Sequence, residues 1–280
     1  GCESGHHGSG IYFTIRTRFP QVRLFRKACN AVMEKPEGKE SVSSFQALMV
    51  STASRVGTGN IVGVSSAICI GGVGSVFWMW IIAILGSASA LAESTLAQIY
   101  KKKGEDGKCY GGPAYYIEAA LHSRELAVVF CIAMILTYAF GFNMLASYNL
   151  QSTFAGQPFY NADITPWIIG GILALVMGWC LLGGGNRIVK VTSTLVPFMG
   201  IAYILVSLLV VVLNIGQLPS VMAQIFKEAF DFKAIFAGFA GSAMMQGIRR
   251  GLYSNEAGIG SAPNAAASAV VSHPVKQGLV

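Results

Sequence analysis

The stretch "RVGTGNIVGV" (Arg55–Val64) lies in the middle of an apolar run, Phe45–Ile70, that is long enough to cross a membrane. This stretch nevertheless holds three glycines together with a threonine, an asparagine and an arginine. Glycine weakens a helix, and a charged side chain inside the bilayer is costly. Non-helical backbone survives at membrane depth only where it lines a cavity or is buried in protein. The stretch therefore predicts a membrane helix that is interrupted to form a binding site.

The rest of the chain has the composition of an all-α, polytopic membrane protein. Of its 280 residues, 53% are hydrophobic and only 12% are charged, whereas a soluble domain carries about 25% charged residues. Its mean hydropathy is +0.56. The apolar runs are each about 20 residues long, which suits spanning helices. A β-barrel would need short alternating segments instead.

The apolar runs predict six core helices and a seventh that begins after Pro263. The six are Phe45–Ile70, Ser75–Tyr100, Leu126–Phe154, Thr165–Leu182, Val191–Leu213 and Ala234 to about Arg249. Lys and Arg gather in alternate connections, and such residues accumulate on the cytoplasmic side. We therefore expect core helices one, three and five to run from inside to outside. The net charge of +7 then reports topology and not nucleic-acid binding.

The interrupted stretch supplies groups that can bind an anion such as a carboxylate and a cation. Gly57 and Gly59 permit unusual dihedrals and close approach, while Thr58 and Asn60 add oxygens. Free amides at the start of a half-helix attract a carboxylate, and free carbonyls can hold Na⁺. The alternative is close helix packing through a GxxxG pair, Gly59 and Gly63. That alternative explains the glycines but leaves Thr58 and Asn60 without a role.

The sixth core helix repeats the feature. The stretch "FAGFAGSAMMQG" (residues 236–247) places Gly238, Gly241 and Ser242 in the middle of the span. Two Gly-interrupted helices of opposite direction, in the first and sixth positions, are typical of transporters built from two inverted five-helix repeats.

Several motifs resemble the alanine or glycine:cation symporter family, also called the sodium:alanine symporters. They are "FQAL" (45–48), "VGTGNIVGV" (56–64), "FWMW" (77–80), "GGPAYYIE" (111–118) and "SNEAGIGSAPNAAA" (254–267). The resemblance implies a LeuT-like (APC-type) inverted-repeat fold, of which this chain holds the first five-helix repeat and the first helix of the second. It also implies Na⁺-coupled symport of alanine, D-alanine or glycine across the plasma membrane by alternating access.

Under this interpretation the chain is an N-terminal fragment. It starts with Gly1, and "GCESGHHGSG" lacks the features of a signal peptide. Residues 1–44 would be the remnant of an extra helix and a basic cytoplasmic linker, and residues 45–216 the first repeat. Residues 217–280 would hold an extracellular loop, the sixth core helix and a cytoplasmic segment.

The resemblance also implies a site. The expected substrate-binding residues are Gly57, Thr58, Gly59, Asn143, Gly238, Phe239, Gly241 and Ser242, and the expected Na⁺ ligands are Asn60 and Val56. The expected partners are a small amino acid, Na⁺ and membrane lipid, with no nucleic acid. An ion or small-solute channel using the same breaks is the alternative function. We expect no enzyme, because the chain has no HExxH motif, nucleophile elbow or P-loop.

The third core helix departs from the family pattern. The family often has "NMVQAN", whose glutamine reaches the substrate, whereas this chain reads "NMLASYN" (143–149). Ala146 stands where glutamine is expected, and Tyr148 takes the position of the family asparagine. Asn143 and Asn149 remain as polar groups. The identity of the amino acid is left open by this difference.

We also expect an ion pair among three charged residues. Arg55 and Glu93 fall inside spans, where a charge is usually paired or faces a cavity. We expect Arg55 to pair with Glu93 or with Glu256. Such a bridge would close the inner exit; a static bridge or a snorkelling arginine is the other interpretation. The Gly and Pro of "SNEAGIGSAPN" (254–264) predict a non-helical hinge, gate loop or tight turn.

Overall fold

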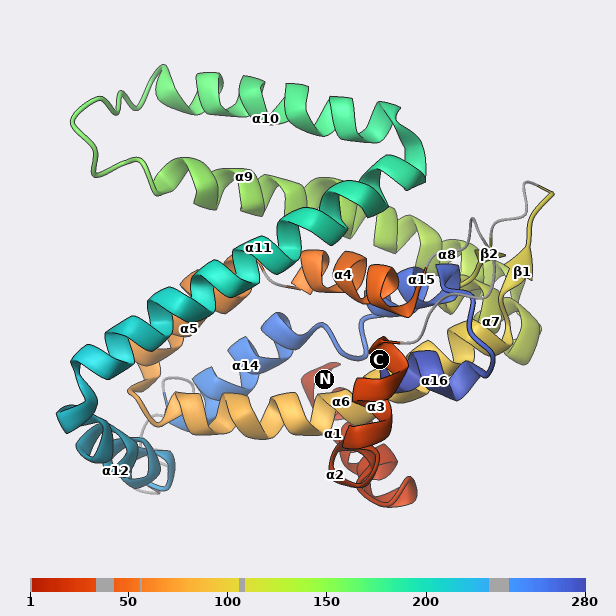
Figure 1. Ribbon diagram of the computed structural model, residues 1–280, viewed down its shortest axis with the longest axis horizontal. Coiled ribbons are helices and arrows are strands. Elements are labelled where there is room, and N and C mark those ends of the chain that lie inside the picture. The colour runs from red at the N-terminus through yellow and green to blue at the C-terminus, as the bar shows by residue number, and fades with distance from the viewer. Residues whose placement is uncertain (1, 34–42, 56, 106–108, 232–241) are drawn as a thin grey trace.

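The computed structural model describes residues 2–33, 43–55, 57–105, 109–231 and 242–280. These residues are mostly helical (Figure 1). A short antiparallel hairpin, β1 (Lys102–Lys103) with β2 (Cys109–Tyr110), follows the second core helix. The expected all-α, polytopic architecture is confirmed at this level.

The helices follow the chain in the expected order. The helices that precede the β-hairpin are α1 (Cys2–Arg16), α2 (Pro20–Arg23), α3 (Phe25–Val32), α4 (Ser44–Arg55), α5 (Thr58–Gly71) and α6 (Ser75–Ile99). Next come α7 (Pro113–Leu121), α8 (Arg124–Ile135), the π-helix η1 (Leu136–Phe142), α9 (Asn143–Ser152), α10 (Thr165–Leu182) and α11 (Gly184–Leu213). The last are the 3₁₀ turn η2 (Ile215–Gln217), α12 (Leu218–Ala229), α14 (Ala243–Asn255), α15 (Ser261–Ser268) and α16 (Pro274–Leu279).

Four helices among the described residues are long and apolar enough to cross a membrane. They are α6, the continuous helix Arg124–Ser152 formed by α8, η1 and α9, then α10, and α11. They match the second to fifth predicted core helices, although α11 begins at Gly184, before the expected Val191. The first core helix is divided into α4 and α5, so neither half reaches spanning length.

The helix α6 is the centre of the packed part of the molecule. The helices α14, α15, α16 and α1 all contact it (Figure 1). Small residues make the crossing of α14 and α6 close: a Cβ added at Gly247 would meet the Ser75 carbonyl oxygen and lie 2.7 Å from the Cβ of Trp78. This is the way that membrane helices gain packing contact without a hydrophobic driving force between them.

The helix α12 covers the turn between α5 and α6. The backbone amide of Gly74 donates to a carboxylate oxygen of Glu228 at 3.3 Å, and the indole of Trp78 donates to the Ala229 carbonyl at 3.0 Å. The ring of Phe77 packs against Phe226 and Phe230. The expected extracellular loop is thus an ordered, aromatic cap.

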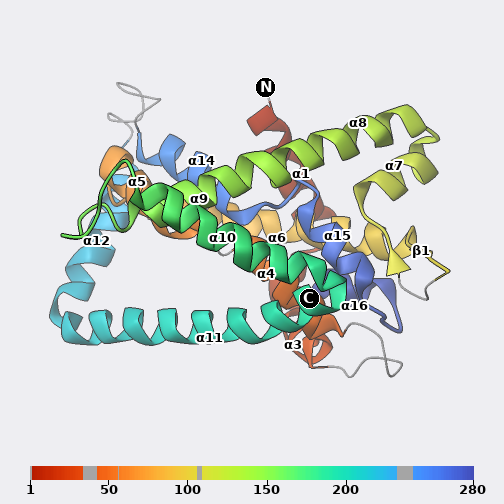
Figure 2. The same ribbon diagram turned by 90° about the horizontal axis from the view of Figure 1, so that it is seen from above.

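The helices α10 and α11 present bare apolar surface. Figures 1 and 2 show α10 beside α9, and Figure 1 shows α10 away from α6. Trp167, Leu182 and Leu213 are 82%, 91% and 74% exposed. Exposed apolar area of this extent is unfavourable in water, so these faces suit contact with lipid or with other protein.

Candidate functional site

The first core helix is broken at the predicted place. The helix α4 ends at Arg55, and α5 begins at Thr58 with Gly57 as its N-cap. The Gly57 backbone is extended, with φ −135° and ψ −155°, a conformation open to any residue. No described atom lies within 4 Å of the position that a Cβ would take on Gly57. The described residues therefore leave open space beside the break, and none of them closely approaches Gly57.

Asn60 holds the two half-helices together. Its side-chain amide donates to the backbone carbonyl of Arg55 at 2.5 Å, across the break. Its side-chain oxygen accepts a hydrogen bond from the hydroxyl of Ser254, near the end of α14. One asparagine thus joins α4, α5 and α14. The Asn60 oxygen has a second lone pair, so it keeps the capacity to bind a further donor or a cation.

The second predicted break coincides with the start of a helix. Ser242 is the N-cap of α14, and its hydroxyl accepts from the backbone amide of Met245 at 3.3 Å. The positive end of the α14 dipole therefore lies at Ser242. Gly238, Phe239 and Gly241 lie outside the described residues, as does the expected start of this helix at Ala234. Its end was predicted too early, because α14 continues past Arg249 to Asn255.

The segment after α14 is more helical than predicted. Only residues 256–260 are non-helical, since α14 runs to Asn255 and α15 begins at Ser261. Gly258 and Gly260 have φ values of 88° and 91°, which glycine adopts without strain. Pro263 lies in the first turn of α15, where its missing N–H leaves no hydrogen bond unmade. The expectation that Gly and Pro exclude regular helix over 254–264 is wrong for the ends of that segment.

Two carboxylates, those of Glu256 and Glu93, fix this short turn. Glu256 is 3% exposed, and its carboxylate accepts from the hydroxyls of Tyr138 at 3.3 Å and Ser261 at 2.8 Å. The carboxylate of Glu93, on α6, accepts from the backbone amide of Gly258 at 3.3 Å. Both acids thus hold the connection between α14 and α15.

Arg55 lies close to both acids. The side chain is near enough to Glu256 and Glu93 to be attracted by each, and Glu256 makes the larger contribution. Yet its buried Nε has no hydrogen-bond partner among the described residues. The structure therefore gathers Arg55, Glu93 and Glu256 in one region, while the carboxylates make their hydrogen bonds to Tyr138, Ser261 and Gly258.

The remaining predicted site residues are less informative. Asn143 is exposed at the start of α9, where its amide donates to the Ala139 carbonyl at 3.1 Å. No hydrogen bond joins it to a described residue of the break. Thr58 and Gly59 form the first turn of α5. Val56 lies outside the described residues.

Sequence reasoning missed an aromatic stack beside this site. The rings of Tyr138 and Phe142, both in η1, are stacked with centroids 4.9 Å apart, and Phe142 stacks on Tyr253 of α14 at 5.7 Å. A π-helix inside an α-helix often occurs at a functional site. The local sequence "LTYAFGF" shows only aromatic residues in a span, so neither the wide turn nor its partner could be found from it.

Buried polar contacts also anchor α15 on α6. The Gln98 side chain donates to the carbonyls of Ala266 at 2.5 Å and Ala269 at 2.9 Å. The ammonium group of Lys101, just after the span, donates to the Ala269 carbonyl and to Gln98. Burial lowers the pKa of Lys101 below its ordinary value. These bonds hold the turn and its carboxylates against the central helix.

Comparison with known proteins agrees with this architecture. The model of the sodium:alanine symporter family matches residues 7–280. The chain is 48% identical to a putative sodium/proton-dependent alanine carrier protein, YrbD, of Bacillus subtilis, over 98% of this chain and 55% of that protein. It is 48% identical to the probable sodium/glutamine symporter GlnT of the same organism, over 97% of this chain and 56% of that protein.

A more distant relative comes from an archaeon. The chain is 38% identical to the sodium/alanine symporter AgcS of Methanococcus maripaludis, over 98% of this chain and 61% of that protein. The chain thus spans little more than half the length of these relatives. With four apolar helices of spanning length and matches along nearly its whole length, this chain is part of an integral membrane protein and belongs to the sodium:alanine symporter family.

Proposed function

We propose that the complete protein containing this chain carries a small neutral amino acid across the plasma membrane together with Na⁺, by alternating access. The observation that carries the proposal is the break between Arg55 and Thr58 in the middle of the first core helix. Interrupted backbone at membrane depth is tolerated where it lines a cavity, and transporters use such half-helices to bind substrate and ion.

The substrate carboxylate would bind at the start of α5. The backbone amides of Thr58 and Gly59 belong to the orphan donors of a helix N-terminus, which favours an anion. The amide of Gly57 donates to the Arg55 carbonyl at 3.0 Å and would exchange this bond for one to the carboxylate. The open space beside Gly57 gives the carboxylate room. Ser242, at the start of α14, would face the remainder of the substrate together with Gly238, Phe239 and Gly241. Asn143 would need to exchange its bond to Ala139 for one to the substrate.

The cation would bind at Asn60. Na⁺ takes oxygen ligands, and the Asn60 side-chain oxygen lies at the junction of α4, α5 and α14. The backbone carbonyl of Val56 would be a second ligand. Since Asn60 already connects the two halves of the first core helix with the sixth, a cation there would strengthen the same junction.

The substrate is proposed to be alanine, D-alanine or glycine. Two of the relatives are named for alanine and one for glutamine, so glutamine is the informative comparison. Ala146 replaces the glutamine that the family often has, which removes one polar contact from the third core helix. A pocket closed by backbone would exclude large side chains, and efficient uptake of leucine would contradict it.

The proposed architecture is the LeuT-like fold. Residues 45–216 would form the first repeat, and residues 217–280 would begin the second, after an extra helix and linker in residues 1–44. The support is the pair of helix starts at Thr58 and Ala243, which lie in the first and sixth core helices. Matching positions in two inverted repeats give this arrangement.

Uptake by the full-length protein in liposomes tests the proposal. Labelled L-alanine, D-alanine, glycine and glutamine would be supplied with and without an imposed Na⁺ gradient. We expect uphill accumulation of at least one of the first three that needs the Na⁺ gradient. Equilibration that never exceeds the outside concentration would indicate a channel. No uptake of the first three, with or without uptake of glutamine, would overturn the proposed substrate class.

A further inference from the structure

A small cavity lies on the α4 side of the break, apart from the open space beside Gly57. It has a volume of about 170 Å³, room for about five waters at their liquid volume. Its walls come from α4, α6, α15, α16, the end of α14 and Val280. Small apolar side chains, among them Ala47, Ala90 and Ala266, line part of it.

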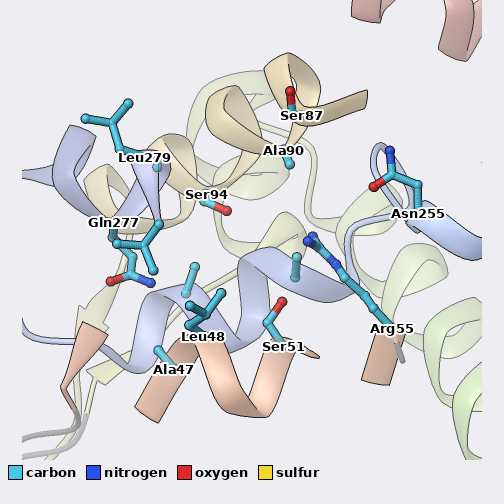
Figure 3. A pocket seen from close by; sticks show the side chains of 14 residues that line it. Ala47, Leu48, Ser51, Arg55, Ser87, Ala90, Ser94, Asn255, Gln277 and Leu279 are labelled. Carbon is cyan, nitrogen blue, oxygen red and sulfur yellow. The ribbon is translucent and has the colours of Figure 1, made fainter. Parts of the chain in front are cut away.

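Arg55 is the charged group in the lining. Figure 3 shows its guanidinium group reaching into the cavity. The buried Nε of this group has no hydrogen-bond partner among the described residues. A buried donor on a cation that makes no hydrogen bond is costly. The two acids that attract Arg55, Glu93 and Glu256, make their hydrogen bonds elsewhere and are not among the lining residues.

Further donors converge on the same space. The hydroxyls of Ser51 and Ser94 point into it (Figure 3). The side chains of Ser94 and Asn255 make no hydrogen bond to another described residue. On the other side of the cavity, the buried amide oxygen of Gln277 also lacks a partner within the described chain. Three of the lining side chains, those of Arg55, Ser94 and Asn255, therefore keep capacity to donate, and the Gln277 oxygen keeps capacity to accept.

We infer that this cavity is a second binding site, which takes the carboxylate of the amino acid on the cytoplasmic side of the break. Arg55 is its charged donor, and Ser94 and Asn255 complete the hydrogen bonds. Guanidinium binds carboxylate with paired, charge-assisted hydrogen bonds. Glu93 and Glu256 lower the positive potential around Arg55, so a zwitterion suits the site better than a simple anion. The inference rests on the proposed function, and it assigns Arg55 to substrate release and not to an ion-pair gate.

The position of the cavity places this site on the path from the break to the cytoplasm. On the predicted topology α4 begins in the cytoplasm, so the cavity lies between the break and the inner surface. A substrate that leaves the central site inward would meet Arg55 next. The site would then raise the affinity of the inward-facing protein for the amino acid and leave the affinity of the outer face unchanged.

Transport by the full-length protein from each face separately tests the inference. Right-side-out membrane vesicles present the outer face to labelled L-alanine, and inside-out vesicles present the cytoplasmic face. Arg55→Gln is expected to raise the half-saturating alanine concentration about tenfold or more at the cytoplasmic face, since a bond to a charged group is lost. The half-saturating alanine concentration at the outer face should stay within about twofold of that of the unmodified protein. Arg55→Lys should restore part of the affinity because it keeps the charge.

Ser94→Ala provides a milder variant if Arg55 variants fail to reach the membrane, with an expected rise of about threefold at the cytoplasmic face only. Arg124→Gln is the matched control: Arg124 is exposed and lies outside the cavity, so neither face should change. Equal shifts at both faces, or no shift at either, would overturn the inference and leave the proposed function standing. Absence of Na⁺-dependent uptake by the unmodified protein in both kinds of vesicle would overturn the proposed function and the second site together.

Discussion

The hydroxyl of Ser254 donates a hydrogen bond to the side-chain oxygen of Asn60, although 194 residues separate the two. Asn60 follows the break in the first core helix, and Ser254 lies near the end of the sixth. Since Asn60 also bonds to the Arg55 carbonyl, the two halves of the first core helix and α14 are joined through a single side chain. The proposed ion site and the closure of the break are therefore the same structural feature.

Substituting Asn60 should affect stability and ion affinity together. Asn60→Ala leaves the Ser254 hydroxyl without its partner and removes one of the two donors to the Arg55 carbonyl, which keeps the Gly57 amide. We expect a cost of about 1–3 kcal/mol in unfolding free energy. Ser254→Ala removes one bond only and should cost about 1 kcal/mol. The measurements are thermal unfolding in detergent and the Na⁺ dependence of alanine uptake. If Asn60→Ala lowered stability but kept the Na⁺ dependence, the residue would hold the helices without binding the ion.

Substituting Gly57 should affect substrate binding without affecting stability. Serine is favoured at a helix N-cap, and no described atom lies within 4 Å of the added Cβ. Gly57→Ser should therefore leave thermal stability nearly unchanged, yet raise the half-saturating alanine concentration because the side chain occupies the space of the carboxylate. Normal uptake by Gly57→Ser would remove this space from the proposed site.

Gly71→Ala is the contrasting variant in the same helix. Its added Cβ would lie 2.8 Å from the Cβ of Gln246 on α14, and overpacking of this kind costs about 1–3 kcal/mol. We expect its thermal stability to fall, with the half-saturating concentration for alanine little changed in the fraction that folds. This pair of glycines distinguishes space kept for a ligand from space used in packing.

The crossing of α6 and α14 should be sensitive to one methyl group. Gly247→Ala brings a Cβ against the Ser75 carbonyl and to 2.7 Å from the Cβ of Trp78, so we expect a loss of about 1–3 kcal/mol in unfolding free energy. Gly200→Ala, in α11, is the control, because no described atom lies within 4 Å of its Cβ position. Thermal unfolding of both variants in one detergent compares them. Equal stability of the two would show that the helices shift apart at little cost.

The stability losses caused by substituting Glu256 and Tyr138 should not be additive. Tyr138→Phe removes a single hydrogen bond and should cost about 1 kcal/mol, whereas Glu256→Ala also leaves the Ser261 hydroxyl unpaired and should cost about 1–3 kcal/mol. In the Glu256→Ala background, Tyr138→Phe should add little, since the partner is already gone. Tyr203→Phe, on an exposed part of α11, is the control for the effect of removing a tyrosine hydroxyl on unfolding free energy. Additive losses would show that the Tyr138 hydroxyl contributes through a contact other than Glu256.

The sequence was informative where one local signal decides the structure. Thr165–Leu182 is bounded by a proline at its start and a glycine after its end, and both limits were predicted. The break after Arg55 was predicted because glycine and polar residues are both unfavourable in the middle of a membrane helix. In contrast, the ends of the "SNEAGIGSAPN" segment were wrong. The left-handed backbone at Glu256 ends α14, and composition alone does not locate such a cap.

The partners of the site residues could not be predicted. Tyr138 and Glu256 are 118 residues apart, and Asn60 and Ser254 are 194 apart. Such pairs depend on how the helices pack, and the residue pattern of a single helix does not predict its packing partners. The expected attraction between Arg55 and the two acids follows from the cost of charge in a membrane. The hydrogen bonds of those acids to Tyr138, Ser261 and Gly258 follow from the tertiary structure only.

The π-helix Leu136–Phe142 sets the rotation of everything that follows it in the third core helix. Its i→i+5 turns absorb one residue more than the turns of an α-helix do. Wound as an ordinary α-helix, the same seven residues would turn about 100° further about the axis, so Asn143–Ser152 would present a different side to α5 and α10. Deleting one residue from this segment would remove that surplus, and the segment could then wind as an α-helix while the side that Asn143–Ser152 presents stays nearly the same.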